Sequence, residues 1–215
     1  MGGCCGSEPL PDAQARPTIQ SSSVVKLEQK AKEKVIHTLK HLPLWGNAED
    51  FNDKSKKVFQ WPVMEDLENF PEGPFHMKKL QLKSAFDGLN SGICSVRVEL
   101  TNECTSSEIK VDGVDSKLAQ SLDFPSDPQK VKQAIAYDDQ QGVFNIYLMD
   151  KQGNAVSHYD PKNYGKPKYG QKLQKFESHE EIIGVYGSHP KAGTSDIFSS
   201  FGFVILSSTR ERNDE

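Results

Sequence analysis

The feature that most constrains the fold is a series of short alternating segments after Phe75, each followed by a turn. The segment CSVRVEL places Val96, Val98 and Leu100 at every second position, and GVFNIYLMD, EIIGVYG and SSFGFVIL are rich in β-branched and aromatic residues. Turn-forming stretches such as KVDG, DKQGN and SHPKAG separate these segments. Because side chains alternate across a strand, the pattern predicts an antiparallel all-β domain.

Composition limits the functions that this domain can have. The chain has 215 residues, a formal net charge of −4 and 35% hydrophobic residues, as expected for one globular domain with flanking segments. The mildly acidic balance argues against nucleic-acid binding, which requires clustered Lys and Arg. The sequence has no apolar run of bilayer length and no pattern of a secretory signal, so we expect the mature chain in the cytoplasm.

The cysteines are too few and too unevenly spaced for a disulfide framework or a zinc site, and no metal or cofactor is expected. Cys94 and Cys104 are interpreted as small buried or half-buried residues. The remaining two, Cys4 and Cys5, are adjacent in the opening stretch MGGCCG. Exposed free thiols are prone to oxidation and add nothing to packing, so this pair indicates a use.

Lipidation is the use that we predict for this opening stretch. Gly2 could accept myristate after removal of Met1, although the acceptor pattern has Ser or Thr at position 6 and this chain has Gly6. Palmitate on Cys4 and Cys5 would complete the anchor, because one acyl chain holds a protein only marginally. The alternative is a chance cysteine pair in a disordered tail. Residues 1–23 are therefore predicted to be a flexible acylated leader that attaches the chain to the cytoplasmic face of a membrane.

An amphipathic helix is predicted over residues 24–42. Apolar residues recur at helical spacing after a serine cap and before Pro43, namely Leu27, Ala31, Val35, Leu39 and Leu42. The polar face is rich in lysine, so the helix could lie on an anionic membrane, occupy the groove of a partner, or pack against the neighbouring domain. Deletion of Met1–Gly46 is accordingly expected to leave a folded β domain.

Residues 43–72 are predicted to be a strap or linker laid against a domain, because prolines interrupt a stretch with several large aromatic residues. The all-β domain itself is placed at residues 73–208. A charged tail follows at residues 209–215.

Three stretches of this domain resemble the jacalin-related lectins, in the order in which that family has them. GPFHMKKLQLKSAFDGLNSGICSVRVEL is similar to the opening of the family, and NAVSHYDPKNYG to the end of a strand and a loop in its middle sheet. KLQKFESHEEIIGVYGSHPKAGTSDIFSSFGFVIL resembles its closing hairpin. The resemblance implies a β-prism of three antiparallel four-stranded sheets that binds carbohydrate without a metal ion.

The resemblance also implies a sugar site on the last loop, formed by Gly193, Thr194, Ser195 and Asp196. A carboxylate at Asp196 could accept hydrogen bonds from two neighbouring sugar hydroxyls. The loop departs from the family pattern at Ala192, where the family has glycine. Asp196 could instead serve folding alone, since Asp in turns often accepts a hydrogen bond from its own backbone two residues on.

A second departure from the family concerns His76 and Met77. They stand where the family usually has a glycine pair near the sugar, and their side chains could fill that pocket.

The sequence offers little support for catalysis. It has no nucleophile context such as Gly-x-Ser-x-Gly and no phosphate-binding glycine loop before a helix, so no enzyme is expected. Two functions remain. The first is a membrane-anchored, lectin-like module that binds a carbohydrate or a glycosylated partner. The second is a structural or adaptor protein that uses the prism to bind another protein, its sugar site lost.

Overall fold

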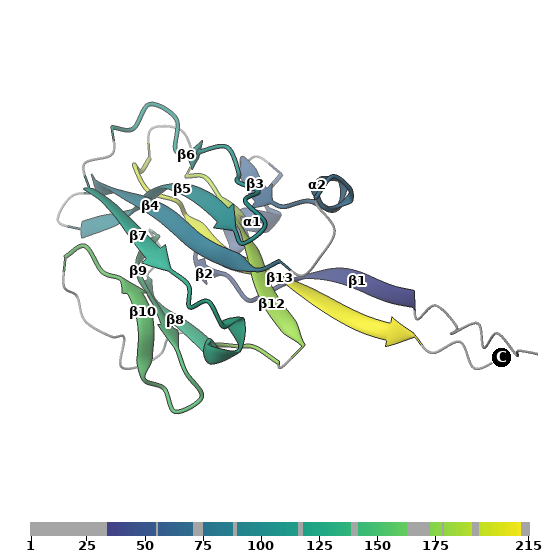
Figure 1. Cartoon of the computed structure of the whole chain (residues 1–215). Helices are drawn as coiled ribbons and strands as arrows, with labels where there is room; N and C mark the ends of the chain where they lie inside the picture. The colour runs from purple at the N-terminus through teal and green to yellow at the C-terminus, as the bar shows by residue number, and fades with distance from the viewer. Residues whose placement is uncertain are drawn as a thin grey trace, which may run out of the picture. The chain divides into compact units, whose positions relative to one another are not determined.

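The computed structural model describes residues 34–54, 56–70, 75–87, 90–115, 118–138, 142–162, 173–177, 179–190 and 194–211 (Figure 1). The predicted leader, with Gly2, Cys4 and Cys5, lies outside the described residues. So do residues 24–33 of the predicted helix, and Gly193 of the predicted sugar site.

Sheet B shows the alternation that the sequence predicts. Its strands, in the order β6-β5-β4-β7, are β4 (Met77–Asp87), β5 (Asn90–Leu100), β6 (Ile109–Lys110) and β7 (Leu118–Asp123). Leu80 and Leu82 of β4 are fully buried and Gln81 between them is exposed. One face of this sheet therefore belongs to the core and the other carries polar residues.

Sheet C consists of strands in the order β10-β9-β8-β11. They are β8 (Gln133–Asp138), β9 (Val143–Met149), β10 (Ala155–Tyr159) and β11 (Gln174–Lys175). Every residue of β9 is buried, including Asn145 within a largely apolar sequence. A short 3-10 helix, η1 (Pro128–Lys130), precedes β8, and Asp127 Oδ1 accepts a hydrogen bond from Gln129 N at 3.0 Å to cap it.

Sheet A contains five strands, in the order β1-β13-β12-β3 with β2 also paired to β13. They are β1 (Lys34–His41), β2 (Trp45–Gly46), β3 (Val58–Trp61), β12 (Glu180–Ser188) and β13 (Ser200–Glu211). Two short helices accompany its early strands: α1 (Glu49–Asn52) lies between β2 and β3, and α2 (Met64–Glu68) follows β3.

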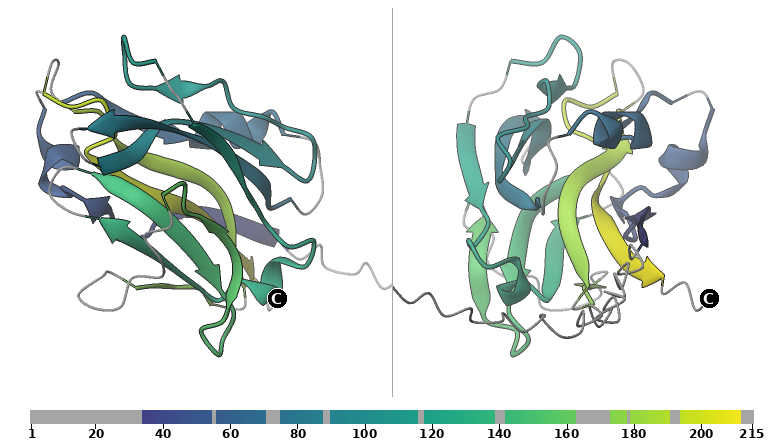
Figure 2. Two further views of the ribbon diagram at one scale, coloured as in Figure 1. Left: turned by 90° about the vertical axis from the view of Figure 1, so that its left-hand side faces the viewer. Right: turned by 45° about the vertical axis from the view of Figure 1, so that its right-hand side comes forward.

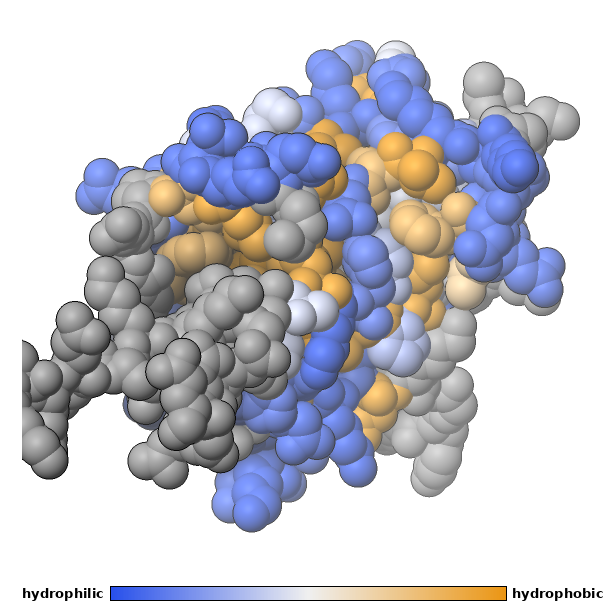
Figure 3. All heavy atoms as spheres, turned by 90° about the vertical axis from the view of Figure 1, so that its right-hand side faces the viewer, coloured by the Kyte–Doolittle hydropathy of each residue, from blue (hydrophilic) through white to orange (hydrophobic). Residues whose placement is uncertain are grey.

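Unlike sheet B, sheet A is apolar on both faces. Its outer face includes Ile183 and Val204, against which Phe51 of α1 and Leu67 of α2 pack. Tyr186 lies there too, and its hydroxyl donates to the carbonyl of Leu42. Burial raises the pKa of Tyr186 to about 12, so this hydroxyl stays protonated. On the side from which β1 and β13 extend, hydrophobic side chains are visible between hydrophilic ones (Figure 3).

The three sheets surround one hydrophobic core (Figure 2). Leu82 of sheet B, Ile146 of sheet C and Phe203 of sheet A are all fully buried members of it. All strand pairs are antiparallel in the part of the chain that the structure describes. The prediction of an all-β fold with three antiparallel sheets is confirmed, except that sheet A has a fifth strand.

The helix predicted over residues 24–42 is wrong where the structure describes it. Lys34–His41 is strand β1, which pairs with Val204–Glu211 of β13 along its whole length. The same stretch contains the β-branched residues Val35, Ile36 and Thr38, which favour a strand. Pairing with the long strand β13 outweighs a helical preference that is weak in isolation.

Residues 43–72, predicted as a strap or linker, supply β2, β3 and both short helices. Trp45 is fully buried in the core, and Phe59 is nearly so. Trp61 and Phe70 are partly buried and pack against the same core. The segment is therefore part of the folded domain, which begins before residue 73 and ends within the predicted tail, since β13 reaches Glu211.

Candidate functional site

One hairpin from each sheet ends at the same end of the domain, which we call the apical end. These hairpins join β4 to β5, β8 to β9, and β12 to β13. Phe198, between β12 and β13, donates its N–H to the carbonyl of Ile93 on β5 at 2.8 Å. Asp138, at the end of β8, accepts a hydrogen bond from Gly46 N at 2.6 Å, and Gly46 pairs with Ser200 of β13. The topology thus brings all three sheets together around the last loop.

Two buried side chains fix the backbone of that loop. Ile197 and Phe198 are fully buried, and Ile197 packs against two glycines of the neighbouring hairpins. A Cβ atom on Gly92 would lie 2.5 Å from Cδ1 of Ile197, and one on Gly142 would lie 2.6 Å from the carbonyl oxygen of Phe198. A larger residue at Gly142 would clash with the backbone of the loop, and one at Gly92 would force the Ile197 side chain to shift.

The described residues of the predicted sugar site, Thr194, Ser195 and Asp196, lie together directly before this anchor. Thr194 and Asp196 are exposed and Ser195 is half-buried. Ser195 Oγ accepts a hydrogen bond from the N–H of Ile197 at 3.2 Å, two residues on. The hydrogen bond to the backbone two residues on, which was the alternative role considered for Asp196, is thus made by Ser195. The Asp196 side chain is exposed to solvent.

Tyr137 is an apical residue that the sequence analysis missed. It ends the regular part of β8, is 40% exposed, and its ring centroid lies 5.6 Å from that of buried Phe144. Its backbone N–H donates to Asn145 Oδ1 at 2.7 Å, which fixes the strand end. The only signal in the sequence was a tyrosine directly before the turn-like stretch DDQQG.

His189 lies at the start of the last loop and is buried. The centroid of its ring is 5.4 Å from the ring centroids of Phe59 and Phe198. The backbone N–H of His189 donates to the carbonyl of Lys57 at 2.8 Å. Burial lowers the pKa of His189 by removing water from the charged form, and the charge of Lys57 lowers it further, against the opposing effect of Asp112. The neutral imidazole is thus the form that fits this aromatic site.

The two described cysteines are consistent with packing roles. Cys94, on β5, is buried, and its Sγ donates to the carbonyl of Lys83 at 3.4 Å. Burial raises the pKa of Cys94 to about 11, so its thiol is unreactive at neutral pH. Cys104 is half-buried.

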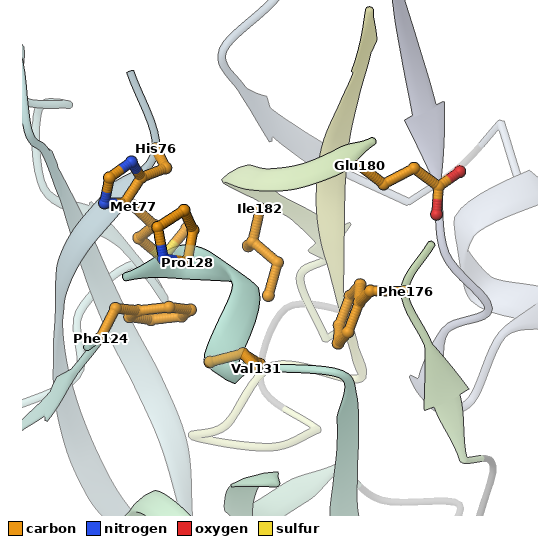
Figure 4. A pocket seen from close by; sticks show the side chains of 8 residues that line it. All are labelled: His76, Met77, Phe124, Pro128, Val131, Phe176, Glu180 and Ile182. Atoms are coloured by element: carbon orange, nitrogen blue, oxygen red, sulfur yellow. The ribbon is translucent and has the colours of Figure 1, made fainter. Parts of the chain in front are cut away.

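His76 and Met77 lie far from the predicted sugar site. Met77 begins β4 at the opposite, basal end, whereas the last loop contacts Ile93, the partner of Ser84. Seven residues of strand separate Met77 from Ser84, roughly 23 Å at the usual rise per residue. Met77 is instead part of a basal pocket (Figure 4), lined also by Phe124, Val131, Phe176 and Ile182. These two residues therefore cannot fill a pocket beside Asp196.

Among the described residues, no group of three or more His, Cys, Asp and Glu side chains is placed to hold a metal ion. The helices that the structure describes include none long and apolar enough to span a membrane.

Comparisons with known proteins give structural matches only. No family model and no curated protein matches the chain. A structural match to PirB has a TM-score of 0.48 at 14% identity and covers 83% of this chain but 40% of PirB. AcmJRL, a mannose-binding jacalin-related lectin from Ananas comosus, matches at 14% identity and a TM-score of 0.45, over 79% of this chain and 98% of its own. Frutalin from Artocarpus incisa matches at 15% identity and a TM-score of 0.45, over 82% and 99% of the two chains.

Proposed function

We propose that the domain is a non-catalytic, lectin-like module that binds carbohydrate at its apical end. The observation that carries this proposal is the Asp196 carboxylate, which is exposed on a loop whose backbone is fixed directly after it by buried Ile197 and Phe198. A preorganised loop loses little conformational entropy when it binds a ligand.

The chemistry of the apical residues suits a sugar. A carboxylate accepts hydrogen bonds from two neighbouring hydroxyls, and such charge-assisted bonds are stronger than neutral ones. The exposed ring of Tyr137 offers an apolar face on an adjacent hairpin. We assign the site to Gly193, Thr194, Ser195 and Asp196, with Tyr137 as a further contact.

A glycan array tests this proposal. The chain should bind a limited set of glycans, and Asp196→Ala should weaken that binding by about tenfold or more, because it removes charge-assisted hydrogen bonds. Asp123→Ala is the matched control, since Asp123 is an exposed carboxylate on β7 at the basal end, and it should bind as the unchanged chain does. Equal binding by all three proteins would overturn the assignment of the site.

An adaptor function is the second candidate, in which the prism is a scaffold for protein binding. It is favoured by β1, an edge strand of sheet A that has no partner on its outer side among the described strands. If the prism serves only as a scaffold, the array should show no glycan binding.

We also propose that the leader anchors the domain to the cytoplasmic face of a membrane through myristate on Gly2 and palmitate on Cys4 and Cys5. The support is the sequence MGGCCG, whose two kinds of acceptor match the requirement of stable anchoring for more than one acyl chain. Replacing both cysteines by serine should move most of the protein from the membrane pellet to the soluble fraction. Unchanged pelleting, or an intact mass without acyl groups, would contradict the proposal.

A further inference from the structure

β1 is an edge strand of sheet A with a long and regular free edge. It is first in the order β1-β13-β12-β3, and its register with β13 runs from Lys34↔Glu211 to His41↔Val204 without a shift. In the described part of the chain, no strand pairs with its other edge. Such an edge presents unpaired backbone donors and acceptors to any extended chain that approaches it.

The other sheet edges are protected against strand addition. β6 and β11 have only two residues each, and β3 has four and is followed by Pro62. β10 is interrupted by an irregularity between Ala155 and Ser157, and β7 lies beside β10 of the neighbouring sheet. Short strands, prolines, bulges and charged side chains, lysine above all, are the usual means by which proteins prevent edge pairing. β1 has eight residues, no proline and no shift in register, so its lysines are the only one of these devices that it carries.

The register identifies the backbone groups that face outward. Leu42 N donates to the carbonyl of Phe203, its direct partner in the continued register, at 3.1 Å. Antiparallel partners alternate between bonded and non-bonded pairs, so the even-numbered residues of β1 bond to β13. The N–H and C=O groups of Val35, His37, Leu39 and His41 therefore point away from β13.

The N-terminal half of β1 also extends beyond the rest of sheet A. β12 begins at Glu180, opposite Ser207, so Ser208–Glu211 of β13 pair with β1 alone among the described strands. Figure 1 shows β1 and β13 projecting together from the domain. A two-stranded ribbon is only marginally stable in water, and a third strand would stabilise it.

The charge of β1 selects the kind of strand that it can accept. The sequence KVIHTLKH contains Lys34, Lys40 and two histidines and no acidic residue. Lys40 Nζ lies 2.9 Å from Glu180 Oε1, yet the Lys40 side chain remains 47% exposed. Two β1 edges brought together would place like charges along the same interface, which disfavours pairing of two copies of this chain.

We propose that the free edge of β1 binds an extended acidic segment of another protein, which joins sheet A as an additional strand. Main-chain hydrogen bonds to the outward groups of Val35, His37 and Leu39 supply the affinity. Acidic side chains opposite the lysines supply the preference. This interaction is independent of the apical sugar site, which lies at the other end of β12 and β13.

Titration of the full-length chain with two fluorescent decapeptides tests the proposal, one alternating valine with glutamate and the other valine with lysine. The glutamate peptide should bind at least about tenfold more tightly, and added salt should reduce the difference. His37→Pro removes an outward N–H without touching a bond to β13, and should weaken binding about tenfold. The control His37→Thr keeps that N–H and should bind as the unchanged chain does.

Amide hydrogen exchange gives a second readout that does not depend on a variant. The glutamate peptide should slow exchange at His37 and Leu39, while Thr38 and Lys40, already bonded to β13, should be protected with or without it. Slow exchange at His37 and Leu39 in the free chain would overturn the proposal, because the edge would already be covered. Protection that grows with protein concentration in the absence of peptide would assign the edge to a second copy instead.

Discussion

At the scale of single residues, the candidate site depends on small residues that lie far from it in the sequence. The backbone at Asp196 is fixed by the next residue, Ile197, whose buried side chain has space only because Gly92 and Gly142 carry no side chain. The sequence analysis named Asp196 because the stretch around it resembles the last loop of the jacalin-related lectins, and such a resemblance is carried by a local pattern. It could not find the glycines, because their role appears only when three hairpins meet. Tyr137 was missed for a related reason, since an isolated tyrosine in a strand has the same pattern whether it packs or binds.

His189 makes the stability of the last loop dependent on pH. Its pKa is lowered in the folded chain, mainly by burial, whereas in the unfolded chain it titrates near the ordinary value of about 6.5. Below that pH the unfolded state binds more protons than the folded state, so the free energy of unfolding falls as pH decreases through this window. The contribution of one such group to the slope is at most about 1.4 kcal/mol per pH unit.

We therefore predict that His189→Gln flattens the pH dependence of stability below about pH 6.5, the ordinary histidine pKa. Urea unfolding of both proteins at several pH values measures this, and the difference between the two curves removes the contribution of the other histidines. Parallel curves would contradict the prediction. Phe59 and Phe198, which contact the His189 ring, remain unchanged in the variant.

At the scale of elements, the sequence predicted best the strands with a clear local signal, either an alternation of apolar and polar residues or a dense run of apolar ones. CSVRVEL lies in β5, where Val96, Val98 and Leu100 are fully buried and Arg97 is exposed, as the alternation predicts. The apolar segments GVFNIYLMD, EIIGVYG and SSFGFVIL correspond to β9, β12 and β13. Each of these signals is local, so it can be recognised without knowledge of the fold.

The N-terminal elements were harder to predict because their signals conflict. The residues around Leu39 have a helical spacing of apolar side chains but also include β-branched residues that favour a strand, and the choice between helix and strand depends on β13, which is distant in sequence. The stretch after Leu42 contains prolines and short elements, which resemble a linker until Trp45 and Phe59 are seen in the core. Tertiary pairing decided both cases, in agreement with the weak influence of local propensity on short elements.

At the scale of the whole molecule, the extra strands of sheet A change where the folded unit begins. A prism of three four-stranded sheets starting at residue 73 would be complete without the N-terminal third of the chain. In the structure, β1, β2 and β3 come from that third and pair with β13 and β12. The compact unit accordingly extends over Glu33–Glu215. The expectation that deletion of Met1–Gly46 leaves the domain folded does not fit this arrangement.

We predict that two deletions distinguish a domain that begins at residue 73 from one that includes β1, β2 and β3. Removing Met1–Lys32 should leave the near-UV circular dichroism spectrum and thermal midpoint almost unchanged, because it takes away none of the strands of sheet A. Removing Met1–Gly46 takes away β1, β2 and Trp45, whose fully buried ring lies 5.7 Å from that of Phe203. Loss of a buried tryptophan alone costs about 3 to 5 kcal/mol, a large part of the stability of a domain of this size.

The longer deletion should therefore lose its near-UV spectrum and its cooperative thermal transition, even if far-UV dichroism still reports strands. Trp45→Ala in the full chain is the matched control. It removes the buried ring but keeps β1 and the backbone of β2, so it should lower the thermal midpoint while the transition stays cooperative. A native near-UV spectrum and a cooperative transition after removal of Met1–Gly46 would mean that sheet A is stable without β1 and β2. The edge available for strand addition would then be that of β13.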